Sequence, residues 1–366
     1  MRLLHFADLH LDTPFHGVGP RHARTRRAAL RTTLRRIVAL AREQRVDALL
    51  CGGDLYEHER FSPDTAAFLR DAFEEAAVPV HLAPGRHDRY GPRSPYRQVA
   101  WSSNVHVFAE DHLVAETLAD GVTLWGAAHR GAAEGDGFLE DFAVDREGVH
   151  LALFHGSELT GLAVQEGGRT PHAAFTADQV ERAGLHHAFL GHFHVPRDAE
   201  RHTYPGNPDP LTFGEGGPRG AVLHTVHDDG RVDRVRYDVA ASRVHDVAVE
   251  LDGVADADRV RERVAAAVAD LEGVVRVTLG GEVGPDADLR PGDLTRCAPH
   301  LEALGVRLGS VRPAVDFAAL AGESTVRGRF VRDVRADGRL DDDTRRRVLV
   351  TGLRALDGRT AELAVL

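Results

Sequence analysis

The sequence contains no lysine: all 45 of its basic side chains are arginine, against 56 acidic ones, and the net charge is −11. Non-specific binding of nucleic acid rests on neutralising phosphates, so this balance argues against a broadly basic surface, although it leaves room for a local basic groove. Cysteine is also scarce. Cys51 and Cys297 lie far apart and fit neither a disulfide framework nor a thiolate metal site, a usage typical of the reducing cytoplasm.

Long apolar runs are missing as well. No stretch reaches the roughly 18 residues expected of a membrane-spanning helix. The N-terminal "MRLLHFADLHLD" meets charged residues too early for a signal peptide. We therefore predict a cytoplasmic protein that does not use a membrane as a partner.

Strand and helix patterns alternate over the first two-thirds of the 366 residues. Apolar runs at residues 2–8, 46–54 and 78–85 predict buried strands, and residues 23–44 and 62–77 between them have apolar side chains at helical spacing. Strand–helix–strand units followed by strand-rich sequence favour an α/β fold, in which sheets pack together with helices outside.

The pattern changes near residue 241, where strand, helix and strand follow one another again. We expect a further helix at residues 294–305 and a last one in the C-terminal tail. The predicted organisation is therefore a main domain at residues 1–240, a smaller α+β domain at residues 241–335 and a helical tail at residues 336–366.

Aspartate and histidine gather where the predicted strands end. The residues at five such ends are Asp8 and His10, Asp54, His87 and Asp88, His155, and His192 and His194. Ligands of open α/β sheets bind at the carboxyl ends of strands, and D-x-H or H-x-H spacing sends two side chains to one side of an extended chain. A lone histidine at a strand end usually satisfies only a hydrogen bond, but five such positions are hard to explain as independent accidents.

Carboxylate and imidazole ligands together suit Mn²⁺, Fe²⁺ or Zn²⁺, and the absence of thiolate argues against a structural zinc site. An aspartate such as Asp54 can bridge two ions. Two ions about 3.5–4 Å apart clamp the attacking and leaving oxygens of a phosphoryl displacement and generate hydroxide near neutral pH. The pattern therefore favours metal-assisted phosphoester hydrolysis.

The motifs "FADLHLDTPF", "GGDLYE", "LFHGSE", "LGHFHVPR" and "YPGNPDPLTFGEGGPRG" resemble those of the calcineurin-like metallophosphoesterases, and within them the SbcD-type DNA repair exonucleases. The resemblance covers roughly residues 1–240, and the "YPGNPDP" stretch is what directs it toward the nuclease branch. It implies two packed mixed β-sheets flanked by helices. More weakly, residues 245–335 are similar to the small capping, DNA-binding domain that follows in that branch.

The resemblance also implies a role for each side chain. Asp8, His10 and His194 would bind one metal ion and His155 and His192 the second, with Asp54 bridging. A metal-bound hydroxide would attack the phosphate. His87 would position the phosphate and protonate the leaving oxygen, and Asp88 would orient His87. The implied activity is Mn²⁺-dependent exonuclease and endonuclease cleavage of DNA, with Mg²⁺, Fe²⁺ or Zn²⁺ as other acceptable ions. The implied partner is a coiled-coil ATPase of the SbcC type, and homodimerisation stays open.

Arg86 departs from the resemblance, because the family has asparagine there, in "GNHD", as a ligand of the second ion. Arginine has no acceptor and stays charged. A guanidinium about 4 Å from a dication would be repelled by about 8 kcal/mol at an effective dielectric of about 20. Arg86 could turn away, weaken the second metal site, or grip a substrate phosphate in place of that ion.

Three functions follow from these observations. The first is a DNA phosphodiesterase that works with an ATPase partner. The second is a catalytically weakened subunit that still binds metal, DNA or the ATPase, for which Arg86 is the only basis. The third is a phosphoesterase of nucleotides or other small phosphate esters, which the acidic net charge permits. The tail helix would pack on its own domain or dock on a coiled-coil partner.

Overall fold

The structure, a computed structural model, describes residues 1–16, 19–131, 137–160, 171–284 and 289–358. The chain divides into two compact units, Met1–Arg243 and Val244–Leu366. The expected separation of residues 241–335 from the tail at 336–366 stays a prediction, and residues 359–366 of that tail lie outside the described part.

The described part of the first unit contains two mixed sheets, each of six strands. The first sheet has the order β12-β11-β1-β2-β3-β4, in which β1 to β4 are parallel, β11 pairs antiparallel with β1, and β12 pairs antiparallel with β11. The second has the order β5-β6-β7-β8-β10-β9. The strands are β1 (Arg2–Phe6), β2 (Ala48–Cys51), β3 (Val80–Leu82), β4 (Val105–Val107), β5 (Val114–Ala119), β6 (Val122–Gly126), β7 (Val149–His155), β8 (His187–Gly191), β9 (Arg197–Asp198), β10 (His202–Tyr204), β11 (Gly220–Val226) and β12 (Val232–Asp238).

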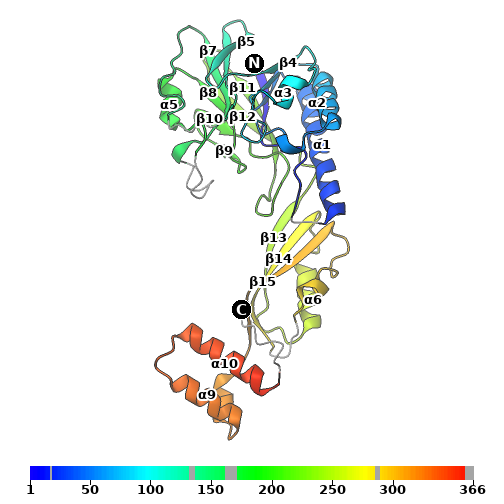
Figure 1. Ribbon diagram of the computed structural model, residues 1–366, viewed down its shortest axis with the longest axis vertical. Coiled ribbons are helices and arrows are strands. Elements are labelled where there is room, and N and C mark those ends of the chain that lie inside the picture. Colours follow the sequence, from blue (N-terminus) through cyan, green and yellow to red (C-terminus); the bar gives the residue numbers. More distant parts are fainter. Residues whose placement is uncertain (17–18, 132–136, 161–170, 285–288, 359–366) are drawn as a thin grey trace. The chain divides into compact units, whose positions relative to one another are not determined.

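The helices of this unit cover the outer faces of the two sheets (Figure 1). They are α1 (Pro20–Glu43), η1 (His58–Arg60), α2 (Pro63–Ala76), α3 (Pro95–Gln98) and α5 (Ala177–Arg182). Ser62 starts α2, because its side chain accepts a hydrogen bond from Thr65 N, and Pro63 has the fixed φ that suits a first helical position.

Alternation along the strands decides which face each side chain meets. Leu4 and Phe6 of β1 pack against α1 and α2, whereas Leu3 of β1 and Leu50 of β2 pack against Phe189 and other residues of the second sheet. On the far side, α5 covers β7, β8 and β10. The prediction of two packed mixed sheets flanked by helices is confirmed, and it places the carboxyl ends of β1, β2, β3, β7 and β8 at a common edge.

The second unit contains a parallel sheet of three strands in the order β13-β14-β15 (Figure 1). Its elements are β13 (Val244–Glu250), α6 (Ala257–Ala267), β14 (Val274–Val283), α7 (Pro291–Leu294), β15 (Ala303–Pro313), α8 (Phe317–Gly322), α9 (Val326–Ala336) and α10 (Asp342–Leu356). Helix α6 packs on the sheet, and α8 to α10 bury a separate cluster around Val331, Leu349 and Leu353.

The helix expected at residues 294–305 is wrong. Only the short α7 lies there, and the chain then enters β15 at Ala303. Pro299 is the physical reason, because a proline within a helix removes a hydrogen bond and clashes with the preceding turn. Strands β5, β9 and β10 and helices α8 and α9 were not expected from the sequence. Among the described residues, no helix has the length and apolarity needed to cross a membrane.

Candidate metal centre

Two glycines let the strand ends of the two sheets meet. A Cβ on Gly52, after β2, would lie 2.7 Å from Gly191 N, and a Cβ on Gly191, at the end of β8, would lie 2.2 Å from Gly52 O. No side chain fits at either position. The close approach brings the chain after β8, which carries His192 and His194, beside the chains after β1 and β2.

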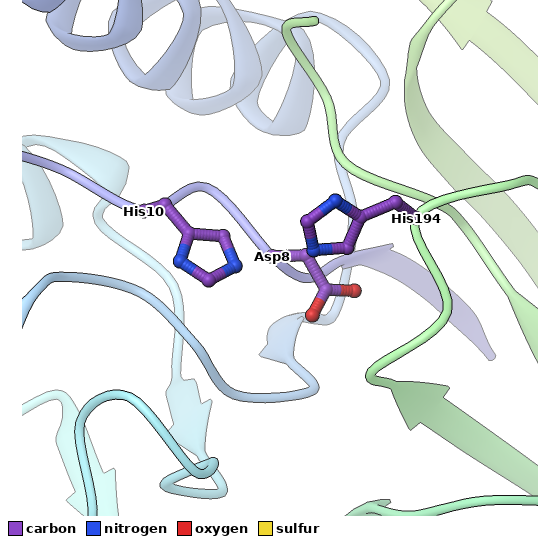
Figure 2. A group of neighbouring side chains, drawn as sticks. All are labelled: Asp8, His10 and His194. Carbon is purple, nitrogen blue, oxygen red and sulfur yellow. The ribbon is translucent and has the colours of Figure 1, made fainter. Parts of the chain in front are cut away.

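The structure brings most of the predicted ligands together. Three groups have ligand atoms within 4.8 Å of one another: Asp8, His10 and His194; Asp8, Asp54 and His155; and His10, Asp54 and His87. Figure 2 shows the first group, with the Asp8 side chain next to the His194 ring and the His10 ring to one side of both. Asp8, Asp54, His10 and His155 are all buried. The predicted assignment of each ligand to a particular ion stays a prediction.

Three imidazoles of this centre are oriented in the same way. Nδ1 of His10 lies 2.8 Å from Glu57 Oε1, Nδ1 of His194 lies 3.0 Å from Glu215 Oε1, and Nδ1 of His155 lies 2.9 Å from Gly52 O. An Nδ1–H donated outward fixes the tautomer, so the lone pair lies on Nε2, as it does in metal-binding histidines.

The inward-facing atoms surround Asp54. Nε2 of His155 lies 3.3 Å and Nε2 of His10 lies 3.6 Å from Asp54 Oδ2. Both Nε2 atoms are buried and have no hydrogen-bond partner among the described residues. Buried polar atoms are normally paired, so two that converge on one carboxylate indicate the place of a ligand.

Two buried carboxylates give this centre its electrostatics. Burial raises the pKa of Asp8, because the charged form is desolvated. Burial also opposes ionisation of Asp54, but the neighbouring His155 and His10 hold the pKa of that carboxyl well below its usual range. Burial likewise works against protonation of His155, yet Asp54 and Asp8 raise its pKa to about 9. The centre therefore attracts positive charge, which a divalent cation would supply in exchange for protons.

The backbone at the centre adopts an uncommon conformation. Asp8, His10, Asp54 and His192 have positive φ angles of 55°, 49°, 51° and 111°. Such angles are uncommon for residues other than glycine, and they concentrate at functional sites, where the surrounding structure holds them in place. Here Asp8 N donates to Gly53 O and His10 N donates to Asp54 O, at 2.9 Å each.

Asp88 does not have the role expected of it. Its carboxylate accepts hydrogen bonds from the N–H groups of Asp54, Leu55 and Gly85 and from the Tyr96 hydroxyl, and it is completely buried. Burial, followed by the charge of Asp54, raises the pKa of Asp88 to about 6. Asp88 thus joins the two loops that carry Asp54 and His87, and among the described residues no hydrogen bond links it to the His87 ring.

Glu57 orients His87 instead, and the sequence reasoning missed it. Its Oε2 lies 3.0 Å from His87 Nδ1 while its Oε1 contacts His10. The His87 backbone N–H donates to Asp54 Oδ1 at 2.7 Å, and the His87 ring lies edge-on to His10 with centroids 4.7 Å apart. The hydrogen bond that the His87 ring donates to Glu57 raises the pKa of His87. The His87 side chain is 47% exposed and so is open to a substrate beside the buried ligands.

Glu215 is a second residue that sequence reasoning missed. Besides His194, its carboxylate accepts hydrogen bonds from Asn207 Nδ2 and from Leu211 N. Burial opposes its ionisation, but His194 and these donors lower the pKa of Glu215 to about 2. Asn207 of the "YPGNPDP" stretch therefore helps to hold Glu215, which in turn orients the ring of His194.

His192 and Arg86 mark the less complete side of the centre. The His192 ring packs edge-on against His155, with centroids 5.1 Å apart, and its backbone N–H donates to Asp8. Among the described residues, however, His192 joins none of the three groups of converging ligand atoms. Arg86 is exposed and, within the described part of the chain, makes neither a hydrogen bond nor an ion pair.

The donor set fits a divalent cation. It consists of carboxylate oxygens and neutral-imidazole nitrogens whose outer atoms are already hydrogen-bonded, which is the arrangement expected around such an ion. Asp8, His10, Asp54, His155 and His194 would hold it. A set of this kind accepts several divalent ions, so it does not select one of them.

Comparison with known proteins agrees with this geometry. The family described as "Calcineurin-like phosphoesterase" matches residues 1–196. The uncharacterized metallophosphoesterase YhaO of Bacillus subtilis is 29% identical over 266 residues, which cover 68% of this chain and 62% of that protein. The DNA double-strand break repair protein Mre11 of Methanopyrus kandleri is 30% identical over 300 residues, 72% of this chain and 62% of that protein.

The chain thus spans about three fifths of the length of these two relatives, 62% of each. Among solved structures, TT1561 of Thermus thermophilus is similar with a TM-score of 0.40 and 15% identity, over 64% of this chain and 98% of that one. The family match covers the five strand ends of the metal centre up to His194. The chain belongs to the calcineurin-like phosphoesterase family.

Proposed function

We propose that the chain is a metal-dependent phosphodiesterase that cleaves DNA, with Mn²⁺ as its preferred ion. One observation carries the phosphoesterase part: His10, His155 and His194 turn their Nδ1 atoms to fixed acceptors and leave Nε2 toward two buried carboxylates. Support for DNA comes from the "YPGNPDP" stretch and from the similarity to an archaeal protein named for double-strand break repair.

A bound divalent ion would polarise the phosphate and lower the pKa of a bound water. The chain's own residues would do the rest. Asp54 fixes the His87 backbone through its Oδ1, and Glu57 fixes the His87 ring. His87 is thereby held at the open side of the centre, where it would protonate the leaving oxygen as a general acid.

The test uses the full chain, stripped of metal and then supplied with Mn²⁺. Labelled linear duplex and single-stranded DNA should be shortened, and His87→Gln should slow the cleavage by about 10²–10⁴-fold while leaving metal affinity in place. Hydrolysis of nucleotides or of small phosphate esters without any action on DNA would refute the DNA assignment and favour the small-molecule hypothesis.

Arg86 stands where the resemblance implies an asparagine ligand of the second ion. Because its side chain is exposed and unpaired among the described residues, we propose that it points away from the ligands and leaves the first ion untouched. Metal content per chain, measured for the wild type and for Arg86→Asn, tests this. The first ion should be present in both proteins. A first ion gained only with Arg86→Asn would contradict it.

We also propose that the partner is a coiled-coil ATPase of the SbcC type and that two copies of the chain associate on DNA. The resemblance to the nuclease branch is the support for both. Light scattering of the purified chain with and without DNA tests the second proposal, and a mass of one chain in both conditions would refute it.

A further inference from the structure

The segment from Arg86 to Arg97 carries a group of exposed positive charges. Its four arginines, Arg86, Arg89, Arg93 and Arg97, are exposed. From residue 78 to residue 109 the sequence has one acidic residue, Asp88, although the whole chain has 56. Asp88 is buried, and its oxygens are taken up by three backbone N–H groups and the Tyr96 hydroxyl. The surface of this segment is therefore cationic without an acidic counterpart.

The same segment is held firmly from inside. Ser94, Tyr96 and Asp88 are buried and alternate with the exposed arginines. Tyr96 donates to Asp88 Oδ2 at 2.7 Å, its backbone N–H donates to Ser94 Oγ, and its carbonyl accepts from Trp101 Nε1. The backbone is thus fixed before any ligand arrives, so a bound anion would not have to order it.

The arginines begin at the metal centre. Arg86 directly precedes His87, whose backbone N–H donates to Asp54 Oδ1. The carbonyl of His87 accepts from His58 N, and Tyr90 N donates to His129 O at 2.7 Å. The segment therefore follows directly on the general acid along the chain, and its first part is tied to the loop that carries Asp54.

Several other arginines of this unit are neutralised. Arg31, Arg130, Arg197 and Arg236 lie between 2.6 and 3.0 Å from carboxylate oxygens of their partners. In contrast, none of the four arginines of the segment forms an ion pair within the part of the chain that the structure describes. An exposed guanidinium that is unpaired and sits on a fixed backbone is suited to bidentate contact with a phosphate.

We propose that Arg86, Arg89, Arg93 and Arg97 bind phosphates that flank the scissile one and so select a polynucleotide strand over a small phosphate ester. The proposal rests on the proposed function, because it places the scissile phosphate at His87. It also gives a way for a chain with a net charge of −11 to hold a polyanion, because the contacts are local.

The test compares two triple variants of equal charge. The first is Arg89→Gln, Arg93→Gln and Arg97→Gln. The control is Arg42→Gln, Arg45→Gln and Arg182→Gln. These three arginines are exposed and come shortly before the amino ends of β2 and β8, which lie at the edge of the sheets opposite the metal centre. Fluorescence anisotropy of a labelled single-stranded oligonucleotide, measured in chelator at salt concentrations between roughly 50 and 200 mM, gives the affinity. It also gives the salt slope, which is the slope of the logarithm of the affinity against the logarithm of the salt concentration.

The first variant should bind more weakly and its salt slope should fall by about 2, since each lost phosphate contact removes about 0.7 on a single strand. The control should keep most of the wild-type slope. Both should still hydrolyse a small chromogenic phosphodiester at the wild-type rate. Equal losses in the two variants, or an unchanged slope in the first, would overturn the proposal.

The same data separate this proposal from the proposed function. Wild-type protein that binds the oligonucleotide through these arginines but does not cleave it with Mn²⁺ would refute the DNA phosphodiesterase and leave the binding surface standing. Wild-type protein that cleaves DNA while the two variants behave alike would refute only the binding surface. A wild type that does not bind the oligonucleotide refutes the binding surface directly.

Discussion

Three histidines packed between the two sheets of the first unit make the stability of the fold depend on pH. His5 of β1 and His224 of β11 belong to one sheet and His187 of β8 to the other, and all three surround Phe189 with ring centroids 4.7–5.5 Å from it. Each is completely buried. Burial and then the charge of Arg236 lower the pKa of His5 to about 3, and burial also lowers the pKa values of His187 and His224.

These lowered pKa values determine how the free energy of unfolding changes with pH. A histidine in the unfolded chain has a pKa of about 6.5. Because the folded values are lower, the unfolded chain binds more protons below about pH 6.5, and folding stability is lost as the pH falls toward the folded pKa. When the pH falls from about 7.5 to about 5.5, each buried histidine lowers the free energy of unfolding by roughly 1.3 kcal/mol, and the three together lower it by about 4 kcal/mol. The total free energy of unfolding of a typical domain is only about 5–15 kcal/mol.

The variant His5→Leu isolates one of these contributions. Urea unfolding in chelator, at the two pH values, should show a loss of stability on acidification that is smaller than in the wild type by about 1.3 kcal/mol. Any packing cost of leucine is present at both pH values and cancels in the difference. His112→Leu serves as control, since His112 is 70% exposed. If His5→Leu and the wild type lose the same stability, or the control reproduces the effect, the reasoning is refuted.

Other predictions concern the residues around the centre. Glu57→Gln should weaken metal binding by about 10–100-fold in calorimetric titration, because it removes the carboxylate that fixes two imidazoles; unchanged affinity would contradict its orienting role. Asp88→Asn should lower the free energy of unfolding by about 2–3 kcal/mol in urea, since it weakens charge-assisted hydrogen bonds to buried N–H groups. In Gly85→Ala the new Cβ would lie 2.4 Å from Asp54 Oδ1, so metal binding should be lost, whereas Gly91→Ala, in open space, should bind normally; equal binding would show that the loop can yield.

Much of the first unit could be predicted from the sequence, because its strands and helices have clear periods and its chemistry sits at strand ends. The predicted ligands Asp8, His10, Asp54 and His194 follow strands that the apolar runs already marked. In the second unit the apolar residues near 294–305 have helical spacing, yet a proline interrupts them and pairing with β14 makes residue 303 onward a strand.

The partners of the ligands could not be predicted in the same way. Glu57 and Glu215 lie inside motifs of the sequence, but nothing in their spacing shows that one carboxylate reaches two histidine rings or that the other reaches His194. Asp88 illustrates the opposite error. A sequence neighbour of His87 was assumed to contact its ring, whereas consecutive residues of a loop direct their side chains differently, one into the protein and one out of it.

The left-handed backbone at Asp8, His10, Asp54 and His192 has an evolutionary consequence. Glycine adopts such angles without steric cost, whereas other residues pay of order 1 kcal/mol or more. At each of these positions one replacement by glycine would relax the backbone and delete a metal-facing side chain or its neighbour. Selection for folding alone would therefore erode the centre. Four of the nine residues other than glycine that have such angles in the described part of the chain lie here, so the centre keeps its side chains at a cost in folding free energy.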